Sequence, residues 1–481
     1  MKVTLRDYQQ GAVDRLRASY GAGNRAPLLV LPTGGGKTVT FAYIAQNSAA
    51  RGKRALILVH RQELLRQSSA TLSGLDVGHG LIAAGGAMSL GQPVQVASVQ
   101  TLIRRLPMLD RAGWRPDLIV VDEAHHATAG SWRTILDHWP ASRVLGVTAT
   151  PCRQDGKGLG VDAGGVFDDM VEGPQIAELI DRGYLAPPEV YAPPVVADLT
   201  GLRSRMGDFA QGEAADRMDR PTVTGDAVAH YARICPGVPA IVFCVSVAHA
   251  EHVAEQFRAS GWRAASLDGG MADVDRRARI DDLAAGRLQV LTSCDIISEG
   301  TDIPVVGAAI LLRPTQSLGL YLQQVGRALR LYPGKVSAII LDHVGNVARH
   351  GLPDEAREWS LAGVEKRGRS KDDDDGPPPP VTCETCYRQI VRPLPPCCPS
   401  CGASLKTAGR EASLQHVEGE LQRITAADRD ALAAQRKREQ GRADTLEELV
   451  ELGRARGYPN PHGWAWRVFS SRSGKHQRAT G

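Results

Sequence analysis

A glycine-rich segment at residues 31–38, with the sequence LPTGGGKT, contains the residue types that bind a phosphate group. It lies between an apolar run, Pro27 to Leu31, which indicates a buried strand, and a helical pattern that begins near Val39. Glycines in such a turn allow backbone N–H groups to face an anion at the helix N-terminus. Lys37 would add a point charge beside the β- and γ-phosphates of a nucleotide, and Thr38 would offer a hydroxyl to Mg²⁺.

The general phosphate-loop pattern has glycine where this chain has Leu31, so a glycine-rich turn without a ligand is the alternative interpretation. Upstream, Leu5 to Gln10 begins a helical pattern in which Gln9 could donate to and accept from the edge of adenine, or could simply belong to a polar helix face. As a nucleotide site, the glycine-rich segment would contribute Thr33, Gly34, Gly35, Gly36, Lys37 and Thr38.

Two carboxylates follow a second apolar run, residues 118–121. Asp122 and Glu123 would lie at the end of a buried strand, where unpaired carboxylates are costly. Asp122 is placed to hold Mg²⁺ through its water shell, and Glu123 to orient and deprotonate an attacking water molecule. The alternative is an acidic pair that caps a helix. A third apolar strand ends in the hydroxyl residues Thr148 and Thr150.

Two arginines in the second half of the chain suit phosphate binding. Arg327 and Arg330 are three residues apart, so we expect both guanidinium groups on one face of a helix. A guanidinium group is always charged and binds phosphate oxygens in a forked geometry. Projected across a cleft from a second lobe, such an arginine stabilises the transferring phosphoryl group, and its removal costs roughly 10³–10⁵ in rate. The alternative is a solvated basic helix face.

These residues require strands that bring them to one edge of a sheet. Strands and helices alternate before residue 153 and again after residue 240, which predicts an α/β fold with parallel sheets and a ligand site at the carboxyl ends of the strands. Between them the pattern weakens, with a polar helix candidate at residues 208–220. The expected parts are a first lobe (1–155), a connection or insertion (156–224), a second lobe (225–365), an acidic and proline-rich linker (366–380), a zinc ribbon (381–405), and a helical segment with a basic-aromatic tail (406–481).

Together, these motifs resemble the DEAD/DEAH-box helicases of superfamily 2. The resemblance covers about residues 1 to 363 and is carried by LPTGGGKT, Asp122-Glu123-Ala124-His125, Thr148-Ala149-Thr150 and the Q-x-x-G-R-x-x-R pattern that starts at Gln323. The family tolerates a residue other than glycine at the position of Leu31. The resemblance implies two tandem RecA-like parallel-sheet lobes that bind ATP and Mg²⁺ between them. The catalytic residues that it implies are Lys37, Asp122, Glu123, Gln323, Arg327 and Arg330.

The resemblance also implies roles for residues outside these motifs. Arg6 and Gln9 would read adenine, and Gly300 and Asp302 would contact the nucleotide and couple it to a bound strand. Residues 339–346 and 350–354 are similar to a segment in phage and prophage helicases of this family, and that group favours DNA over RNA as the track. The implied nucleic-acid contacts in the lobes are Arg61, Gln100, Thr101, Thr148 and Thr150.

In the C-terminal part, the spacing of the cysteines predicts a metal site. Two Cys-x-x-Cys pairs are separated by 11 residues, a spacing typical of a tetrahedral four-cysteine zinc site. Zn²⁺ would supply most of the folding free energy of so small a segment and would be structural, because four thiolates leave no open position. Unliganded thiols or disulfides are the alternative. The expected zinc ligands are Cys383, Cys386, Cys398 and Cys401.

The last residues of the chain, 454–481, have six Arg or Lys and no Asp or Glu. Tyr458, Trp464, Trp466 and Phe469 are interleaved with these basic residues, which suits phosphate contact combined with base stacking. We expect Trp464 and Trp466 to contact nucleic acid. An apolar patch that docks onto the rest of the protein is the alternative.

Length and composition limit the number of domains and the class of protein. The chain has 481 residues, room for about three domains. Its hydrophobic (43%) and charged (23%) fractions are ordinary for a globular protein, and its net charge of +4 does not by itself predict nucleic-acid binding. No apolar signal core begins the chain and no run approaches 18 apolar residues. We therefore expect a protein of the bacterial or phage-infected cytoplasm without a membrane partner.

The leading hypothesis is an ATP-dependent DNA helicase or translocase whose two lobes close on ATP and grip a strand. A second hypothesis is an ATP-gated nucleic-acid-binding switch that remodels a partner without separating strands. A third, a kinase with a phosphate loop, is disfavoured by Asp122-Glu123-Ala124-His125 and the paired arginines.

Overall fold

The computed structural model describes two α/β lobes and parts of the C-terminal region. Described are residues 4–153, 158–192, 204–205, 208–209, 221–294, 303–362, 381–382, 389–390, 422–424, 438–440, 442–443, 445–455, 462, 465–466 and 468–469. The chain divides into two compact units, of which the first holds both lobes: residues 1–196, 203–365 and 418–424. The remaining residues form the second unit.

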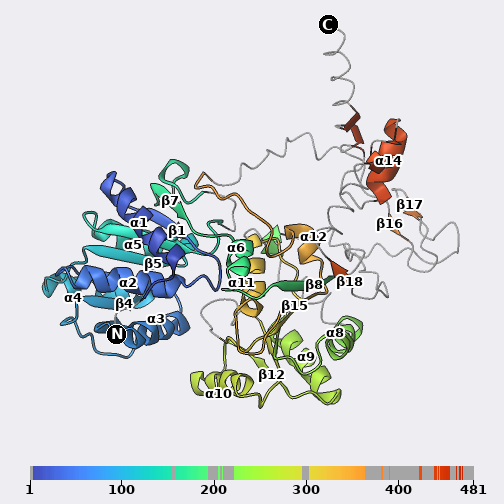
Figure 1. Cartoon of the computed structure of the whole chain (residues 1–481), viewed down its shortest axis with the longest axis horizontal. Helices are drawn as coiled ribbons and strands as arrows, with labels where there is room; N and C mark the ends of the chain where they lie inside the picture. The colour runs from blue at the N-terminus through green and yellow to red at the C-terminus, as the bar shows by residue number, and fades with distance from the viewer. Residues whose placement is uncertain are drawn as a thin grey trace, which may run out of the picture. The chain divides into compact units, whose positions relative to one another are not determined.

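Within the described residues, the first lobe is built on a sheet of seven parallel strands in the order β3-β4-β2-β5-β6-β1-β7 (Figure 1). Near-continuous aliphatic runs such as ALILV in β2 suit a sheet that helices cover on both faces. The strands are β1 (Pro27–Val30), β2 (Ala55–Val59), β3 (His79–Ile82), β4 (Val94–Ser98), β5 (Leu118–Asp122), β6 (Arg143–Thr148) and β7 (Asp169–Glu172).

Alternate side chains of these strands pack against two different layers of helices, as the pleat requires. Leu29 and Ile57 share an apolar cluster with α1, α2 and α3, whereas Leu28 and Leu56 share another with α4 and α5. The helices are α1 (Asp7–Gly21), α2 (Lys37–Ala49), α3 (Gln62–Gly74), α4 (Val99–Arg111) and α5 (Gly130–His138), with short 3₁₀ helices η1 (Ala124–His126) and η2 (Val161–Ala163).

The second lobe repeats this plan with a sheet in the order β12-β13-β11-β14-β15-β8-β18, counted over the described residues. All of its strands are parallel except β18, which pairs antiparallel with β8. The strands are β8 (Pro188–Ala192), β11 (Ala240–Phe243), β12 (Ala264–Leu267), β13 (Val290–Ser293), β14 (Ala308–Leu311), β15 (Ala338–Asp342) and β18 (Gln422–Ile424). The helices are α8 (Pro221–Ile234), α9 (Val247–Ala259), α10 (Asp273–Ala284), α11 (Leu318–Ala328) and α12 (Asn346–His350).

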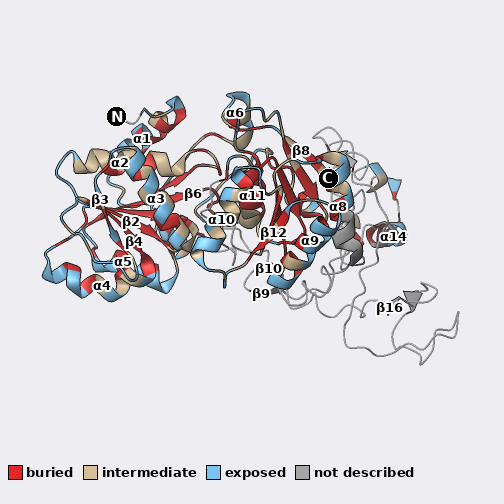
Figure 2. Ribbon diagram, turned by 90° about the horizontal axis from the view of Figure 1, so that it is seen from below, coloured by how far each residue is buried: buried red, intermediate tan, exposed pale blue. Residues whose placement is uncertain are grey.

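A continuous apolar cluster joins the two lobes. It includes Leu31 after β1, Leu185 in the connection and Leu322 on α11. Figure 2 shows the strands of both sheets buried and the outer faces of the helices exposed. Because α11 lies between the two sheets, it is the element of the second lobe that can reach the glycine-rich loop of the first (Figure 1).

The predicted pair of parallel-sheet α/β lobes is confirmed, and the connection between them is more structured than we expected. It adds β7 to the first sheet, forms α6 (Ile176–Asp181), and starts the second sheet with β8. The polar helix predicted from residue 208 is wrong at its start. Asp208 and Phe209 form β10, which pairs antiparallel with β9 (Ser204–Arg205). There the Asp208 carboxylate accepts hydrogen bonds from Thr315 and Gln316, which hold it in place.

In the second unit, the described residues include a short antiparallel pair, β16 (Val381–Thr382) with β17 (Gln389–Ile390), and α14 (Leu446–Ala455). Leu449 and Val450 of α14 form a small apolar cluster that Phe469 packs against. The exposed fraction of Trp466 is 60%, so its ring is accessible for stacking on a base. The four cysteines of the predicted zinc ribbon, and Trp464, lie outside the described residues. In the part of the chain that is described, none of the helices combines the length and apolar character needed to span a membrane.

Candidate nucleotide-binding and catalytic site

The glycine-rich loop between β1 and α2 needs glycine at several positions. Gly34 and Gly36 have φ angles of 83° and 79°, the left-handed region that side chains other than glycine rarely adopt. A Cβ atom on Gly35 would lie 2.9 Å from the carbonyl oxygen of Pro32, and one on Gly36 would overlap the Gln9 amide. Gly36 directly precedes Lys37, the first residue of α2, so the loop ends at a helix N-terminus.

Side chains of helix α1 make hydrogen bonds to the backbone of this loop. The Tyr8 hydroxyl donates to the carbonyl of Gly35 at 3.0 Å, and the buried Gln9 amide donates to the carbonyls of Gly35 and Gly36 at 3.4 Å. The Arg6 backbone N–H donates to Gln9 Oε1 at 2.9 Å, which fixes the glutamine. The structure therefore brings the predicted adenine-reading residues to the phosphate loop.

Two residues of the connection join this corner of the site and were not anticipated. The Arg6 guanidinium lies 4.3 Å from the centre of the Tyr184 ring, which also contacts Tyr8. Leu185 lies so close to Gly34 that a Cβ atom there would be 2.7 Å from its side chain. No local motif marks Tyr184 or Leu185. An aromatic residue next to an aliphatic one after the short α6 is the only sequence signal.

The two carboxylates lie where the sequence places them, at the end of β5. Asp122 and Glu123 are 4% and 8% exposed, and Asp122 Oδ1 accepts a hydrogen bond from the Glu123 N–H at 3.0 Å. Glu123 has φ 50°, an uncommon backbone conformation for a non-glycine residue that costs of order 1–3 kcal/mol and concentrates at functional sites. His125 Nδ1 lies 3.5 Å from Glu123 Oε2, so an imidazole helps to orient the carboxylate.

Thr148 and Thr150, predicted to contact nucleic acid, are both buried at the end of β6. Thr148 Oγ1 lies 3.3 Å from His125 Nδ1, donates to the Thr150 carbonyl and accepts from the Thr150 N–H. These contacts link β6 to Glu123 through His125. They favour a supporting role for both threonines over direct contact with a strand.

Helix α11 presents a glycine face to the first lobe. A Cβ atom on Gly326 would lie 2.6 Å from Thr33 Cβ, and one on Gly319 would lie 3.0 Å from Thr150 Oγ1. Gln323 and Arg327 are buried on this helix at 5% and 6% exposure. The close approach of α11 brings Arg327 beside the phosphate loop.

The predicted single helical face for both arginines is wrong in one respect. Helix α11 ends at Ala328, with Leu329 as its cap residue, so Arg330 follows the helix instead of lying within it. Its Cγ atom still lies 3.7 Å from where a Cβ atom on Gly34 would be. The first lobe is therefore met by one arginine from the last turn of α11 and by a second from the loop that follows.

Charged side chains from both lobes affect the pKa of Lys37. Burial lowers the pKa of Lys37, Glu123 and Asp122 oppose that effect, and Arg327 and Arg330 lower the pKa further. Three cationic side chains and two carboxylates therefore share one partly desolvated region. An anionic phosphate chain would relieve the repulsion among the cations.

The donor set also fits Mg²⁺. Thr38, at the start of α2, offers a hydroxyl and Asp122 a carboxylate, the oxygen ligands that Mg²⁺ takes, with water and phosphate oxygens completing the shell. Among the described residues, the buried Glu123 Oε2 has no hydrogen-bond partner, only the longer 3.5 Å contact with His125 Nδ1, and is available to a water molecule. Within the ranges that the structure covers, no group of three or more His, Cys, Asp or Glu side chains could hold a metal by itself.

The remaining predicted residues fall into two groups. Arg61 and Gln100 meet around His60, because Arg61 Nε contacts His60 Nε2 and Gln100 Nε2 donates to the His60 carbonyl, each at 3.3 Å. Thr101 follows Gln100 in the first turn of α4. Gly300 and Asp302 lie outside the described residues.

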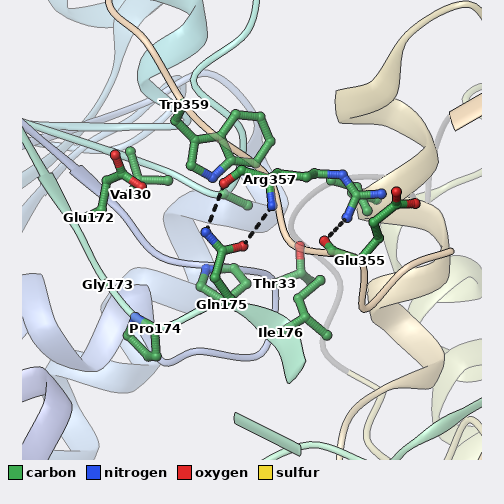
Figure 3. A pocket seen from close by; sticks show the side chains of 13 residues that line it. Val30, Thr33, Glu172, Gly173, Pro174, Gln175, Ile176, Glu355, Arg357 and Trp359 are labelled. Carbon is green, nitrogen blue, oxygen red and sulfur yellow. Dashed lines mark hydrogen bonds between the residues drawn. The ribbon is translucent and has the colours of Figure 1, made fainter. Parts of the chain in front are cut away.

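A small hollow adjoins the phosphate loop on the side of β7 (Figure 3). Thr33 and Leu322 line it together with Gln175, Arg357 and Trp359. The last two belong to residues 352–362, a stretch that we call the return segment because it leaves the second lobe and packs against the first. Gly160 N–H donates to the Leu361 carbonyl at 2.9 Å, which fixes the end of this segment.

Both lobes match known families. Residues 2–153 match the family described as "Type III restriction enzyme, res subunit", and residues 227–332 match the "Helicase conserved C-terminal domain". A "51.5 kDa protein" of Lactococcus phage (isolate 7-9) is 34% identical over 340 residues, which cover 70% of this chain and 70% of that protein. The putative ATP-dependent helicase IRC3 of Saccharomyces cerevisiae is 34% identical over 360 residues, which cover 71% of this chain and 51% of the yeast protein.

Solved structures agree on the fold. A fragment of a putative HsdR subunit of a type I restriction enzyme from Vibrio vulnificus YJ016 superposes with a TM-score of 0.56 at 22% identity, covering 73% of this chain and 66% of the fragment. At that identity the likeness concerns the arrangement of the two lobes alone. The site motifs lie on both lobes, and the two relatives are 34% identical over about 70% of this chain. The chain therefore belongs to superfamily 2 of the helicases, a family of ATP-hydrolysing enzymes.

Proposed function

We propose that the protein is a nucleic-acid-stimulated ATPase that moves along DNA or separates its strands. The observation that carries this proposal is the shared electrostatic environment of Lys37, Asp122 and Glu123 on the first lobe with Arg327 and Arg330 on the second. Neither lobe has a complete set of charges by itself, so nucleotide and lobe closure depend on each other.

In the proposed mechanism each group has one task. Lys37 and the N–H groups of the loop bind the phosphate chain, and Arg327 and Arg330 stabilise the charge that develops on the transferring phosphoryl group. Glu123, whose buried Oε2 is oriented by His125, holds the attacking water and takes its proton. Mg²⁺, when bound with the nucleotide at Thr38 and Asp122, would neutralise charge on the phosphate oxygens.

Hydrolysis would remove the phosphate that attracts both lobes, so the cleft would open after each turnover. A strand that contacts both lobes, with Arg61, Gln100 and Thr101 on the first, would be gripped and released in each cycle. DNA is the proposed track because the first lobe matches a family named for restriction enzymes, which act on DNA. Binding should depend mostly on phosphate contacts and little on base sequence.

The decisive experiment compares Lys37→Ala and Glu123→Gln with the unmodified chain. Lys37→Ala should abolish ATP turnover, whereas Glu123→Gln should bind ATP normally and hydrolyse it roughly 10²–10⁴ times more slowly. Glu178→Gln is the matched control, because Glu178 is exposed and pairs with Arg182 within the same helix region. Normal hydrolysis by Glu123→Gln would refute the assignment.

The track is identified by ATPase stimulation with single-stranded DNA, duplex DNA, forked DNA and RNA. Displacement of a strand from a tailed duplex identifies a helicase. Stimulation without displacement on either polarity of tail supports a switch that remodels its partner. For the C-terminal part we propose one structural Zn²⁺ held by Cys383, Cys386, Cys398 and Cys401, and metal analysis of protein purified without chelator tests it.

A further inference from the structure

Lys335 lies in the loop between α11 and β15, and its side chain reaches back to the end of α11. The ammonium group donates to the carbonyl oxygens of Arg330 and Val306, each at 2.7 Å, and also to the carbonyl of Ala328. The three N–H donors of a lysine thus meet three backbone acceptors. Lys335 is half-buried, so these contacts are partly shielded from water.

The three carbonyls belong to different parts of the second lobe. Ala328 is the last residue of α11, and the final carbonyl groups of a helix have no partner within the helix. Arg330 follows the helix, and Val306 precedes β14, a central strand of the second sheet. A positive charge at a helix C-terminus is favourable on its own. Here it also ties the helix end to the sheet.

The tied backbone carries the two arginines that face the phosphate loop. Arg327 is in the last turn of α11, and Arg330 lies two residues beyond the end of the helix. The Arg330 carbonyl accepts a hydrogen bond from Lys335. Because a displacement of about 1 Å can cost roughly 10²-fold in rate, the support of this loop matters for catalysis.

We infer that Lys335 is a positioning residue that fixes the end of α11, and with it Arg327 and Arg330, for action on the phosphoryl group. The inference rests on the function proposed above for the two arginines. The hydrogen bonds of the Lys335 ammonium group are made to backbone carbonyls, among them that of Arg330, and not to the guanidinium groups themselves. Its role is to hold backbone atoms, and it depends on the positive charge of the ammonium group.

That charge is sensitive to pH near neutrality. Burial lowers the pKa of Lys335 to about 8, and repulsion from Arg330 contributes in the same direction. The other contacts of the ammonium group, from α11 and from the segment before β14, are backbone carbonyls. As the pH rises through about 8 the group loses its proton, so its hold on the carbonyls weakens at alkaline pH and is complete below that pKa.

The experiment uses the full chain with Lys335→Met, and Lys53→Met as the matched control because Lys53 is an exposed lysine on the first lobe. DNA-stimulated ATPase is measured between about pH 6.5 and 9.5, with kcat and KM for ATP separated. At neutral pH, Lys335→Met should lower kcat by roughly 10–100-fold with little change in KM. The ratio of the wild-type kcat to the variant kcat should shrink as the pH passes about 8.

A Lys335→Met kcat within about twofold of wild type, or a ratio that stays flat with pH, would overturn the inference while leaving the proposed function intact. If Lys335→Met does not fold, Lys335→Arg provides the test, because its charge persists through this pH range. The ratio of its kcat to that of wild type should rise with pH, and a flat ratio would overturn the inference. A wild-type chain without ATPase activity would overturn both proposals. Normal turnover by Glu123→Gln would overturn the proposed function alone.

Discussion

At Gly326 the two lobes approach each other so closely that there is no room for a side chain. A Cβ atom there would lie 2.6 Å from Thr33 Cβ and 2.8 Å from Thr33 Cγ2 in the phosphate loop. Alanine is the better helix former by about 1 kcal/mol, so Gly326→Ala should not weaken α11 itself. It should instead push α11 away from Thr33 and lower kcat/KM for ATP at least roughly 10-fold.

Gly11→Ala is the matched control for this substitution. Gly11 also lies within a helix, α1, but the nearest atom to its added Cβ would be Arg15 Nη1 at 3.9 Å. This variant should keep full ATPase activity and gain about 0.5–1 kcal/mol of stability in denaturant unfolding. Equal ATPase activity of the two variants would show that α11 does not need its close contact with Thr33.

Residues whose chemistry depends on local spacing could be predicted from the sequence. Lys37 follows a glycine-rich turn, and Asp122 and Glu123 follow an apolar run, so the neighbouring residues in the sequence indicate their roles. Tyr184 and Lys335 could not be predicted in this way. Their partners, Arg6 and the carbonyls at the end of α11, reach them only through tertiary folding.

At the scale of elements, the return segment ties the second lobe to the first. The Gln175 side chain makes two hydrogen bonds to one residue of this segment: its Nε2 donates to the Arg357 carbonyl at 2.9 Å, and its Oε1 accepts from the Arg357 N–H at 3.4 Å (Figure 3). The Arg357 side chain in turn donates to the carbonyls of Leu352 and Glu355 and so shapes the segment. Trp359 packs against apolar clusters on both faces of the first sheet.

Gln175→Ala should therefore detach the return segment from α6. Losing two hydrogen bonds to partly buried backbone groups should lower the free energy of unfolding by about 1–3 kcal/mol, measured by denaturant titration. Gln10→Ala is the control. The Gln10 side chain donates to Asp14 on the exposed side of α1, so its loss should change stability by less than about 0.5 kcal/mol. Equal stability of the two variants would mean that the segment docks without help from Gln175, through contacts such as those of Trp359 and the bond from Gly160 to Leu361.

Element boundaries were predictable to within one residue where a strand is a short aliphatic run between clear breaks, as for β1 and β5. The edge strands β3 and β7 were not predicted, because two of the four residues of β3 and three of the four residues of β7 are not fully buried. Their sequences, HGLI and DMVE, also lack a continuous apolar pattern. Strand β10 was missed for a different reason. A tertiary hydrogen bond from Thr315 to Asp208 overrides the local preference of a polar segment.

At the scale of the whole molecule, the lobes also meet away from the phosphate loop. Helix α3 of the first lobe and α10 of the second exchange ion pairs: Arg66 with Asp273 at 2.5 Å, and Glu63 with Arg276. The Arg276 side chain is 12% exposed and that of Glu63 is 24% exposed, so this pair is the better shielded of the two. Helix α3 begins directly after Arg61, a residue proposed to contact the strand. In the proposed mechanism, lobe closure and strand contact would therefore involve the same helix.

Glu63→Gln should make closure of the lobes less favourable, because it leaves the Arg276 guanidinium partly buried beside a neutral amide. Removing one partner of a shielded pair costs more than the roughly 0–1 kcal/mol of an exposed pair, and 1.4 kcal/mol corresponds to a factor of ten in an equilibrium. The DNA concentration for half-maximal ATPase should rise by roughly 5–10-fold, while the rate at saturating DNA should hardly change. The control is Asp282→Asn, whose 2.5 Å pair with Arg287 lies within the second lobe and is exposed. If Glu63→Gln and Asp282→Asn need the same DNA concentration, the pairs between α3 and α10 do not contribute to closure, and the nucleotide site alone must bring the lobes together.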